Sequence, residues 1–379
     1  MSTNTVARAM VQDCFAVKET TKGTAVFPTA ATHRIVTAGT AEINQQATFS
    51  DSEEIANSLD ILDRFQDQMG AGSFSVPMYL RPSGTAGTAP MGDILLESLM
   101  GVGTKDGTVK YSFTQATTKP SFTLWIKKSH TVFFATGSCI ESGTLNLTNQ
   151  GGAKLDMSGG FMKMGWAGTD IANAAVTAKI VAVENAKLFT AGAYIQLGTD
   201  HNTNQGYRIA SVDYDTNTLT MDDTITAASG VVVKGFLPTF TAVGEVLENK
   251  NTTITFDTVS KNLKSLNLSI NSPVAWQTDE ITISGYVTEY IEDRRSITSS
   301  IDVLFREQDL SYFYDATQNT QVDVIITIAD GAGKTCTINL PYTELEVPNI
   351  TTSSPTVSLS ISGTSLGNLG EDSCSIVFT

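Results

Sequence analysis

Few residues in this chain have the type and spacing that catalysis or metal binding requires. The three histidines are His33, His130 and His201, and none lies in a metal-ligand spacing such as His-x-x-x-His or beside a paired cysteine. His201 follows Asp200, but both stand in a turn rich in Gly and Asn, where a solvated histidine is far commoner than a catalytic one. The histidines therefore predict neither a metal site nor a general base.

The acidic residues do not form a recognisable site either. Two short acidic turns, 200–206 and 213–217, resemble the start of a calcium-binding loop, but neither has the glycine in its required place or the closing Glu. Carboxylates are numerous enough for a glycosidase-like acid pair, yet no two are singled out. No nucleophile-elbow, dinucleotide-binding or phosphate-loop motif stands between a strand and a helix. We therefore expect a protein that is not an enzyme, with no catalytic residue, metal or cofactor.

The four cysteines are scattered, without Cys-x-x-Cys spacing: Cys14, Cys139, Cys336 and Cys374. So few cysteines in so long a chain do not indicate a disulfide scaffold. Cys336 alternates with Ile338 and Leu340, so we expect it to point into a core as a small apolar residue.

The net charge of −15 is concentrated near the end of the chain, where residues 241–379 hold 18 acidic and 7 basic side chains. Such a protein is poorly suited to grip nucleic acid, which requires Lys and Arg to neutralise phosphates. Two interpretations stay open. The acidity keeps the protein soluble, or an acidic wall repels phosphate and lets enclosed DNA slide.

The sequence predicts no export signal and no membrane anchor. No apolar run follows MSTNTVARAMVQD, and no apolar stretch approaches the ~20 residues of a membrane span. We expect a chain that is cytoplasmic when it is made.

The elements that would position any site are mainly strands, and the pattern of the sequence predicts that one β-rich unit occurs twice. Period-two alternation marks SFTLWI, GTLNLTN and AKLDMSG near the end of the first copy, and VDVIITI, YTELEVPN and TVSLSISG near the end of the second. The matched positions are Leu145 and Leu147 with Leu345 and Val347, and Leu155 and Met157 with Val357 and Leu359.

Each copy also predicts one short helix. The first spans 92–100, with Asp93 as N-cap and Gly101 after its end. The second lies in REQDLSYFYDA, 306–316, and should pack through Leu310, Phe313 and Tyr314. Between the copies, residues 168–238 break the pattern. AGAYIQLG, GYRIASVDYD and NTLTMDD indicate short strands, and we interpret the block as a small inserted β-barrel or sandwich.

Several of these segments resemble the tail tube proteins, or major tail proteins, of long-tailed, siphovirus-like bacteriophages. The run DSEEIANSLDILDRFQDQMGAGSFSVPMYL and the following GDILLESLMG are similar to the N-terminal half of that family, and ETTKGTAVFPT to its opening. FTLWIKK and ATGSCIESGTLNL resemble its next strands, and GNLGEDSCSIVFT its closing turn and strand. The resemblance covers both copies but not the middle block.

The resemblance implies a mainly β chain with duplicated tail-tube β-sandwich or barrel units at 1–167 and 239–379, each with a short flanking helix, around the inserted domain at 168–238. It implies a structural virion protein whose rings, here of three chains, stack into a tube for DNA ejection with an acidic lumen. Partners would be other copies of the chain, the tape-measure protein, tail terminator or tip proteins, and phage DNA that passes without specific binding. The chain would be assembled in the host cytoplasm and located in the virion tail.

Two acidic segments are candidates for the lumen or for contacts between rings. Their residues are Asp51, Glu53, Glu54, Asp60, Asp63, Asp67, Asp279, Glu280, Glu289, Glu292, Asp293, Arg294 and Arg295. The alternative is another β-rich virion protein: a capsid decoration protein, or a tail-associated protein that binds or hydrolyses glycans. A decoration protein would not need the doubled unit, and a hydrolase would need a clustered acid/base site.

Overall fold

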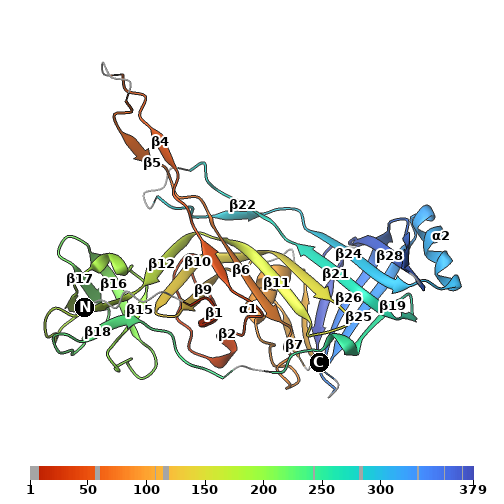
Figure 1. The fold of residues 1–379 in the computed structure, drawn as a ribbon, viewed down its shortest axis with the longest axis horizontal. Coiled ribbons are helices and arrows are strands. Elements are labelled where there is room, and N and C mark those ends of the chain that lie inside the picture. The colour runs from red at the N-terminus through yellow and green to blue at the C-terminus, as the bar shows by residue number, and fades with distance from the viewer. Residues whose placement is uncertain are drawn as a thin grey trace.

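The computed structural model is an elongated, mainly β molecule in which distant parts of the sequence lie side by side (Figure 1). It describes residues 8–379 except 56–59, 107, 114–118, 242–243, 281–284, 331–332, 354 and 369. Within that part of the chain, two short α-helices and four 3-10 turns accompany the strands. The turns are η1 (Ala31–His33), η2 (Ala186–Leu188), η3 (Asn249–Asn251) and η4 (Glu307–Leu310). The expectation of a mainly β fold is confirmed.

The first sheet is a continuous run of antiparallel strands. In pairing order they are β2 (Arg34–Ile35), β1 (Gln12–Lys18), β9 (Phe122–Lys128), β10 (Thr131–Leu147), β11 (Lys154–Phe161), β6 (Gly72–Tyr79) and β3 (Glu42–Asn44). Alternate residues of β6 are buried, as the period-two pattern predicts. β10 bulges between Ile140 and Ser142, where Gly159 of β11 comes so close that a Cβ would lie 1.9 Å from the Cys139 carbonyl oxygen.

The second sheet is a run of the same kind. In pairing order its strands are β20 (Val259–Lys261), β19 (Thr252–Phe256), β25 (Gln321–Ala329), β26 (Thr335–Leu345), β28 (Thr356–Ser365), β24 (Ser296–Leu304) and β21 (Leu263–Asn271). Each run uses its strands in the same chain order as the other, and a short helix follows the fourth strand in both. β12 (Lys163–Ala167) pairs with β10 as β29 (Ser375–Phe378) pairs with β26.

The two sheets meet where the second half of β10 pairs with β21, from Ser142 opposite Asn271 to Leu147 opposite Leu266. The hairpin of β7 (Thr104–Asp106) and β8 (Thr108–Ser112) also adds to β29. One continuous apolar cluster contains buried residues from both sheets. The second sheet therefore begins on an edge of the first, and the two share a core.

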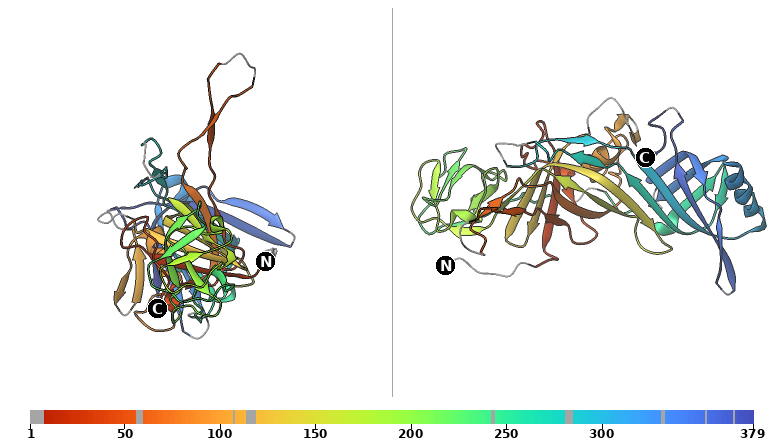
Figure 2. Two further views of the ribbon diagram at one scale, coloured as in Figure 1. Left: turned by 90° about the vertical axis from the view of Figure 1, so that its left-hand side faces the viewer. Right: turned by 90° about the horizontal axis from the view of Figure 1, so that it is seen from above.

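A hairpin leaves each sheet between its third and fourth strands. In the first sheet it is the arm formed by β4 (Phe49–Asp51) and β5 (Arg64–Gln66), which stands away from the body (Figures 1 and 2). In the second it is β22 (Val274–Trp276) with β23 (Tyr290–Glu292), and β22 lies along the body. The two hairpins thus hold equivalent places in the chain order but different positions against the body.

The middle block forms a six-stranded sheet at one end of the molecule (Figure 2). In sheet order its strands are β13 (Thr169–Ile171), β18 (Val232–Gly235), β15 (Tyr194–Leu197), β16 (Tyr207–Asp213), β17 (Thr218–Met221) and β14 (Ile180–Ala182). Its core continues into the first sheet, where Trp125 and Phe134 stack with ring centres 4.8 Å apart. The three strands expected in this block are confirmed.

The predicted cap of the first helix is wrong by one residue. α1 (Asp93–Met100) has Gly92 as its N-cap, at φ 78°, where a glycine avoids the strain of a left-handed backbone. Asp93 instead accepts a hydrogen bond from the Tyr111 hydroxyl, so its side chain makes a tertiary contact and does not cap the helix. The end is as predicted, since the Gly101 N–H donates to the Glu97 carbonyl. Residues 94–100 are all buried.

The predicted packing face of the second helix is wrong at two of its three residues, Leu310 and Tyr314, and right at Phe313. The 3-10 turn η4 precedes α2 (Ser311–Gln318), and its tighter winding changes which side chains face the sheet. Tyr312 is buried and Phe313 packs partly against the core, whereas Leu310 and Tyr314 are exposed.

Two of the matched strand positions are exposed rather than buried. β26 ends at Leu345, so Val347 lies in the link to β27 (Asn349–Ser353). Val357 lies near the start of β28, next to the turn that joins it to β27, and is also exposed. Leu145, Leu147, Leu155, Met157, Leu345 and Leu359 are buried, as the alternation predicts.

Candidate functional site: the hairpins, the open edges and the joint between the sheets

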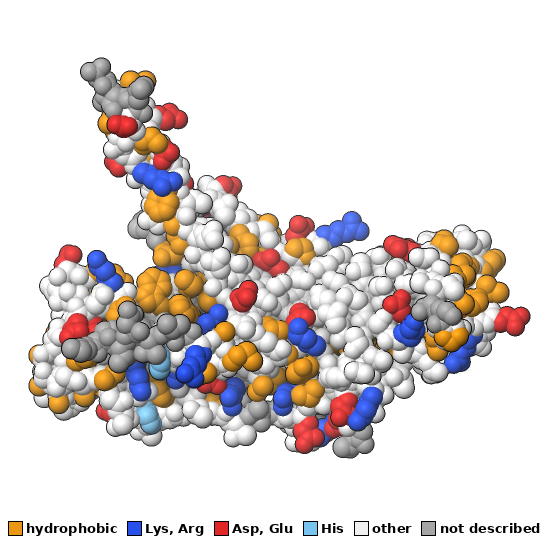
Figure 3. All heavy atoms as spheres, in the orientation of Figure 1, with side chains coloured by type: hydrophobic (Ala, Val, Ile, Leu, Met, Phe, Trp, Pro, Cys, Tyr) orange, Lys and Arg blue, Asp and Glu red, His pale blue; other side chains and the backbone are white. Residues whose placement is uncertain are grey.

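The arm carries five of the acidic candidates on exposed positions: Asp51, Glu53, Glu54, Asp60 and Asp63. Asp67, at its base, is half-buried and accepts a hydrogen bond from the Ser50 hydroxyl at 2.7 Å. Arg64 pairs with Asp51 at 3.2 Å and lies over the ring of Phe49. Phe49 and Phe65 are nevertheless 48% and 55% exposed, and Figure 3 shows apolar and acidic atoms along the arm. Exposed aromatic rings on a projecting hairpin are typical of an interaction surface.

The second hairpin carries the remaining candidates. Asp279, Glu280, Glu289, Asp293 and Arg294 are exposed. Glu292 and Arg295 are half-buried and pair with each other at 2.8 Å. The base of the arm touches the loop between β22 and β23, where the Met69 N–H donates to the Gly285 carbonyl at 2.8 Å and Met69 pairs with Tyr286. The structure therefore brings the base of the first acidic segment against the loop within the second.

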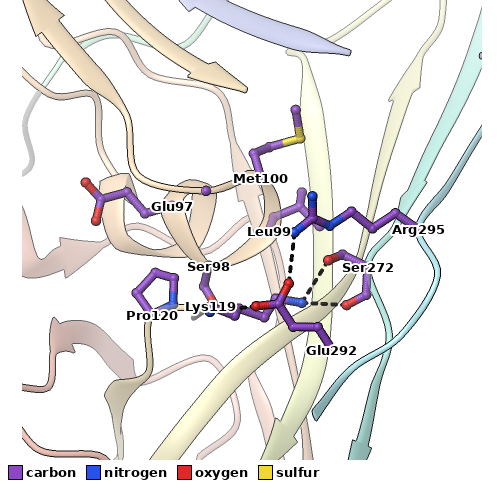
Figure 4. Close-up of a pocket in the computed structure, with 10 residues that line it drawn as sticks. Glu97, Ser98, Leu99, Met100, Lys119, Pro120, Ser272, Glu292 and Arg295 are labelled. Carbon is purple, nitrogen blue, oxygen red and sulfur yellow. Dashed lines mark hydrogen bonds and ion pairs between the residues drawn. The ribbon is translucent and has the colours of Figure 1, made fainter. Parts of the chain in front are cut away.

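A buried lysine fastens the second hairpin to the first sheet (Figure 4). The Lys119 ammonium donates to the backbone carbonyl and the hydroxyl of Ser272, and its backbone N–H donates to Glu292. The Tyr290 hydroxyl donates to the Lys119 carbonyl at 3.0 Å. Arg295, held by Glu292, lies 4.7 Å from the ring centre of Phe113. We call these residues of the first and second sheets the Lys119 clasp.

Burial lowers the pKa of Lys119 from 10.5 to about 8, although the nearby acidic groups Glu292 and Glu141 act in the opposite direction. Desolvation disfavours the charged ammonium, and this effect is the larger one here. The cavity beside the clasp measures only about 10 Å³, which is close to the minimum for one water molecule. This arrangement suits a structural fastening rather than the binding of a small molecule.

The same hairpin also packs over the first sheet through its aromatic residues. Trp276 donates from its indole N–H to Glu141 at 2.8 Å, and its ring lies 5.1 Å from that of Tyr290. Cys139 and Met162 of the first sheet lie in the same small apolar cluster. The joint therefore combines a strand ladder, an apolar contact and the Lys119 clasp.

A buried carboxylate holds the segment that follows β1. Glu19 accepts hydrogen bonds from the hydroxyls of Ser121 and Thr123 and from the backbone N–H groups of Gly23 and Gly137, at 2.8 to 2.9 Å. Four donors around one carboxylate satisfy most of its acceptor capacity. The 19–24 segment is thereby fixed against the bulge region of β10.

Among the strands with an open side in the described part of the chain are β3 in the first sheet and β27 in the second. β3 pairs with β6, and β27 pairs with β28, and neither strand has a ladder on its other side among the described residues. Beside the second edge, Ile350 is 49% exposed and Val347 is exposed as well. An open strand edge offers backbone groups for pairing with another chain.

Two of the three histidines and all four cysteines are held in contacts within the fold. The imidazoles of His33 and His201 accept backbone hydrogen bonds through Nδ1, and His201 stacks on Phe236. All four cysteines are buried, and burial raises the pKa of Cys14, Cys139 and Cys374 to about 12. Cys336 is buried, as its alternation predicts. Over the described ranges, no three His, Cys, Asp or Glu side chains are grouped to hold a metal ion.

No helix in the described part of the chain has both the length and the apolar character needed to cross a membrane.

The sequence predicted two acidic segments as candidate contacts, but it did not predict that they form hairpins or which residues fasten them. Lys119 and Ser272 are 153 positions apart, and neither stands in a motif. Glu19 stands in the ETTKGT segment, which was noted only for its resemblance. A charged residue between apolar strands was the one available signal, and it does not reveal a partner.

Comparison with known proteins gives no further guide to this site. No protein-family model matches the chain, and no curated protein is significantly similar to it.

Proposed function

We propose that this chain is a structural subunit of a bacteriophage tail tube, which assembles head to tail into rings that stack into a hollow conduit for DNA. The observation that carries the proposal is the pair of sheets with the same strand order, joined edge to edge, in which β3 of the first sheet and β27 of the second keep an open side. Two such units in one chain supply two sectors of a ring, so three chains would supply six. The segments that resemble tail tube proteins support this interpretation.

The exposed arm also supports an assembling protein. A hairpin with Phe49 and Phe65 in solvent gains little stability within its own chain, so its apolar surface is best explained by a partner. A second copy of the chain in the assembly would provide that partner.

The direct test of this function is the state of the purified protein. We expect rings of three chains, or tubes built from them, by electron microscopy and by mass measurement. Six chains in one isolated ring would contradict the trimeric arrangement. A protein that stays monomeric at high concentration, or that binds capsids without forming rings, would contradict the proposal that it forms a tube.

The acidic hairpins would repel DNA if they line the lumen. Charge reversal at Asp51 and Asp63, or at Asp279 and Glu280, should then slow DNA ejection from assembled particles at low salt, and added salt should restore the rate. The matched control reverses two exposed acidic residues of the middle block, Glu184 and Asp215. An unchanged rate of DNA ejection in the hairpin variants would show that these residues do not line the lumen.

A further inference from the structure

The joint inside the chain has two sides of different character. The first sheet contributes the second half of β10 as an edge, and α1 beside it. The second sheet contributes the strand β21 and the base of its hairpin, where Ser272, Glu292 and Arg295 face the last turn of α1. The other sheet has an equivalent of each side in its own strand order.

The far end of the second sheet has an equivalent of the β10 edge and α1, and no other strand pairs with it in the described part of the chain. β26 and β27 both pair with β28, one after the other along it. In the first sheet, the single long strand β10 pairs with β11 and β12 in the same way. The edge of β27 is open where the corresponding edge of β10 holds β21. α2 lies at the same end of the molecule (Figure 2). Its Tyr314 is 66% exposed, whereas residues 94–100 of α1 are buried.

The first sheet has an equivalent of β21 and its hairpin base, and no other strand pairs with that edge in the described part of the chain. β3 stands where β21 stands in the other sheet, and its outer edge is open. The β4–β5 arm follows β3 as the β22–β23 hairpin follows β21, and its Phe49 and Phe65 are exposed. Two complementary, uncovered surfaces on one chain are the requirement for a heterologous contact between identical copies.

We propose that the joint between neighbouring chains repeats the joint within each chain: the β27 edge and α2 of one copy receive the β3 edge and the base of the β4–β5 arm of the next. The occupant of both surfaces is a second copy of this chain. The inference rests on the proposed function, which requires rings but leaves open which surfaces join them.

The joint between chains lacks one fastening that the internal joint has. Lys119 lies in the long segment between the end of α1 at Met100 and the start of β9 at Phe122. In the second sheet, α2 ends at Gln318 and β25 begins at Gln321, so no residue takes the place of Lys119. The contact between chains should therefore separate at lower denaturant concentrations than those that part the two sheets of one chain.

Disulfide trapping tests the proposed pairing. Double variants should combine Ile350→Cys or Thr351→Cys with Ile43→Cys or Asn44→Cys, so that the four combinations sample neighbouring registers. At least one should give, after mild oxidation, a covalent ladder on a non-reducing gel that ends at three chains. The native thiols are buried, so single variants should give no ladder beyond a dimer. Absence of cross-linking in all four combinations, in a preparation that forms rings, would overturn the inference.

A charge on the edge gives an independent measurement. Ile350→Arg should raise the concentration needed for assembly at least tenfold, with an unchanged circular dichroism spectrum and unfolding midpoint of the monomer. The matched control is Ile180→Arg, because Ile180 is 55% exposed on β14, an edge strand of the middle block. Normal rings from Ile350→Arg would count against this joint while leaving the tube function standing. A wild-type chain that forms no rings would remove both.

Discussion

At the scale of single residues, buried charges fix the segments that leave the sheets. Glu19 collects four hydrogen bonds where the chain turns away from β1, and Lys119 binds the Ser272 region where β21 ends. A buried ionised group is costly unless it is fully bonded, so each of these groups strongly disfavours other arrangements of its segment. Both residues thereby act as specific fastenings and not as reactive groups.

Replacing Glu19 should therefore destabilise the monomer. Glu19→Ala leaves the hydroxyls of Ser121 and Thr123 and two backbone N–H groups without their acceptor, at a cost of about 3 kcal/mol in the free energy of unfolding. Chemical denaturation measures this loss. Glu184→Ala, at an exposed position, should change the value by less than about 0.5 kcal/mol. A Glu19→Ala variant as stable as that control would show that the network contributes nothing.

The lowered pKa of Lys119 predicts a dependence of stability on pH. Since its folded pKa of about 8 lies below the unfolded value of 10.5, the buried charge subtracts stability below pH 8. This penalty disappears as the folded protein releases the proton, so stability from this group rises with pH above 8. Between pH 7.5 and 9 the gain should be roughly 1 kcal/mol relative to Lys119→Met.

The measurement must stop near pH 9. The cysteines have folded pKa values raised above 9.0, so their contribution is complete below pH 9 and is lost at higher pH as the unfolded thiols ionise. Subtracting the curve of Lys119→Met removes this common background. Parallel curves for wild type and variant across pH 7.5–9 would contradict the assignment to Lys119.

At the scale of elements, the two helices are held in different ways. α1 is enclosed by apolar packing, whereas α2 is anchored at its start by a buried ion pair between Lys261 and Asp309, at 2.5 Å. Asp309 also accepts the Arg306 N–H, and the Lys261 ammonium lies over the Tyr312 ring. α2 is thus held by a polar anchor at its start and by the buried ring of Tyr312.

Breaking that anchor should cost far more than breaking a surface pair. Lys261→Met leaves the Asp309 carboxylate buried without its partner, which should lower the free energy of unfolding by about 3–5 kcal/mol. The control is Lys250→Met, which breaks the exposed pair with Glu248 and should cost less than about 0.5 kcal/mol. Equal effects of the two substitutions in urea titrations would show that burial of the first pair is unimportant for stability.

At the scale of the whole molecule, the middle block is tied to the first sheet by a common core. Phe15, Trp125 and Phe134 of that sheet lie in the same apolar cluster as the interior of the block. A domain attached only by its linkers would bury none of these rings. The block therefore covers a face of the first sheet as well as extending the molecule.

Removing the block should consequently impair the rest of the chain. Deleting 169–234 is compatible with the backbone, because the Gly235 N–H donates to the Gly168 carbonyl at 2.9 Å. The deletion uncovers Phe134 and Trp125, each worth about 1.5–3 kcal/mol of burial. We expect lower solubility and a lower unfolding midpoint, partly restored by Phe134→Thr. A deletion variant that is soluble and as stable as the full chain would contradict the shared core.

The sequence by itself determined the local properties of this protein. Period-two alternation predicted β11 and β25 and their buried residues, because side chains of a strand point alternately to its two faces. The glycine after α1 likewise predicted where that helix ends. These features depend on neighbours in the chain, so a single sequence is enough to show them.

Only the tertiary structure decided how these elements meet. The ladder between β10 and β21, the partners of Lys119 and Glu19, and the enclosure of α1 all join residues that are remote along the chain. The side chain of Asp93 was drawn from its expected cap to Tyr111 for the same reason. Such contacts depend on three-dimensional packing and on the burial of charge, for which alternation and spacing carry no information.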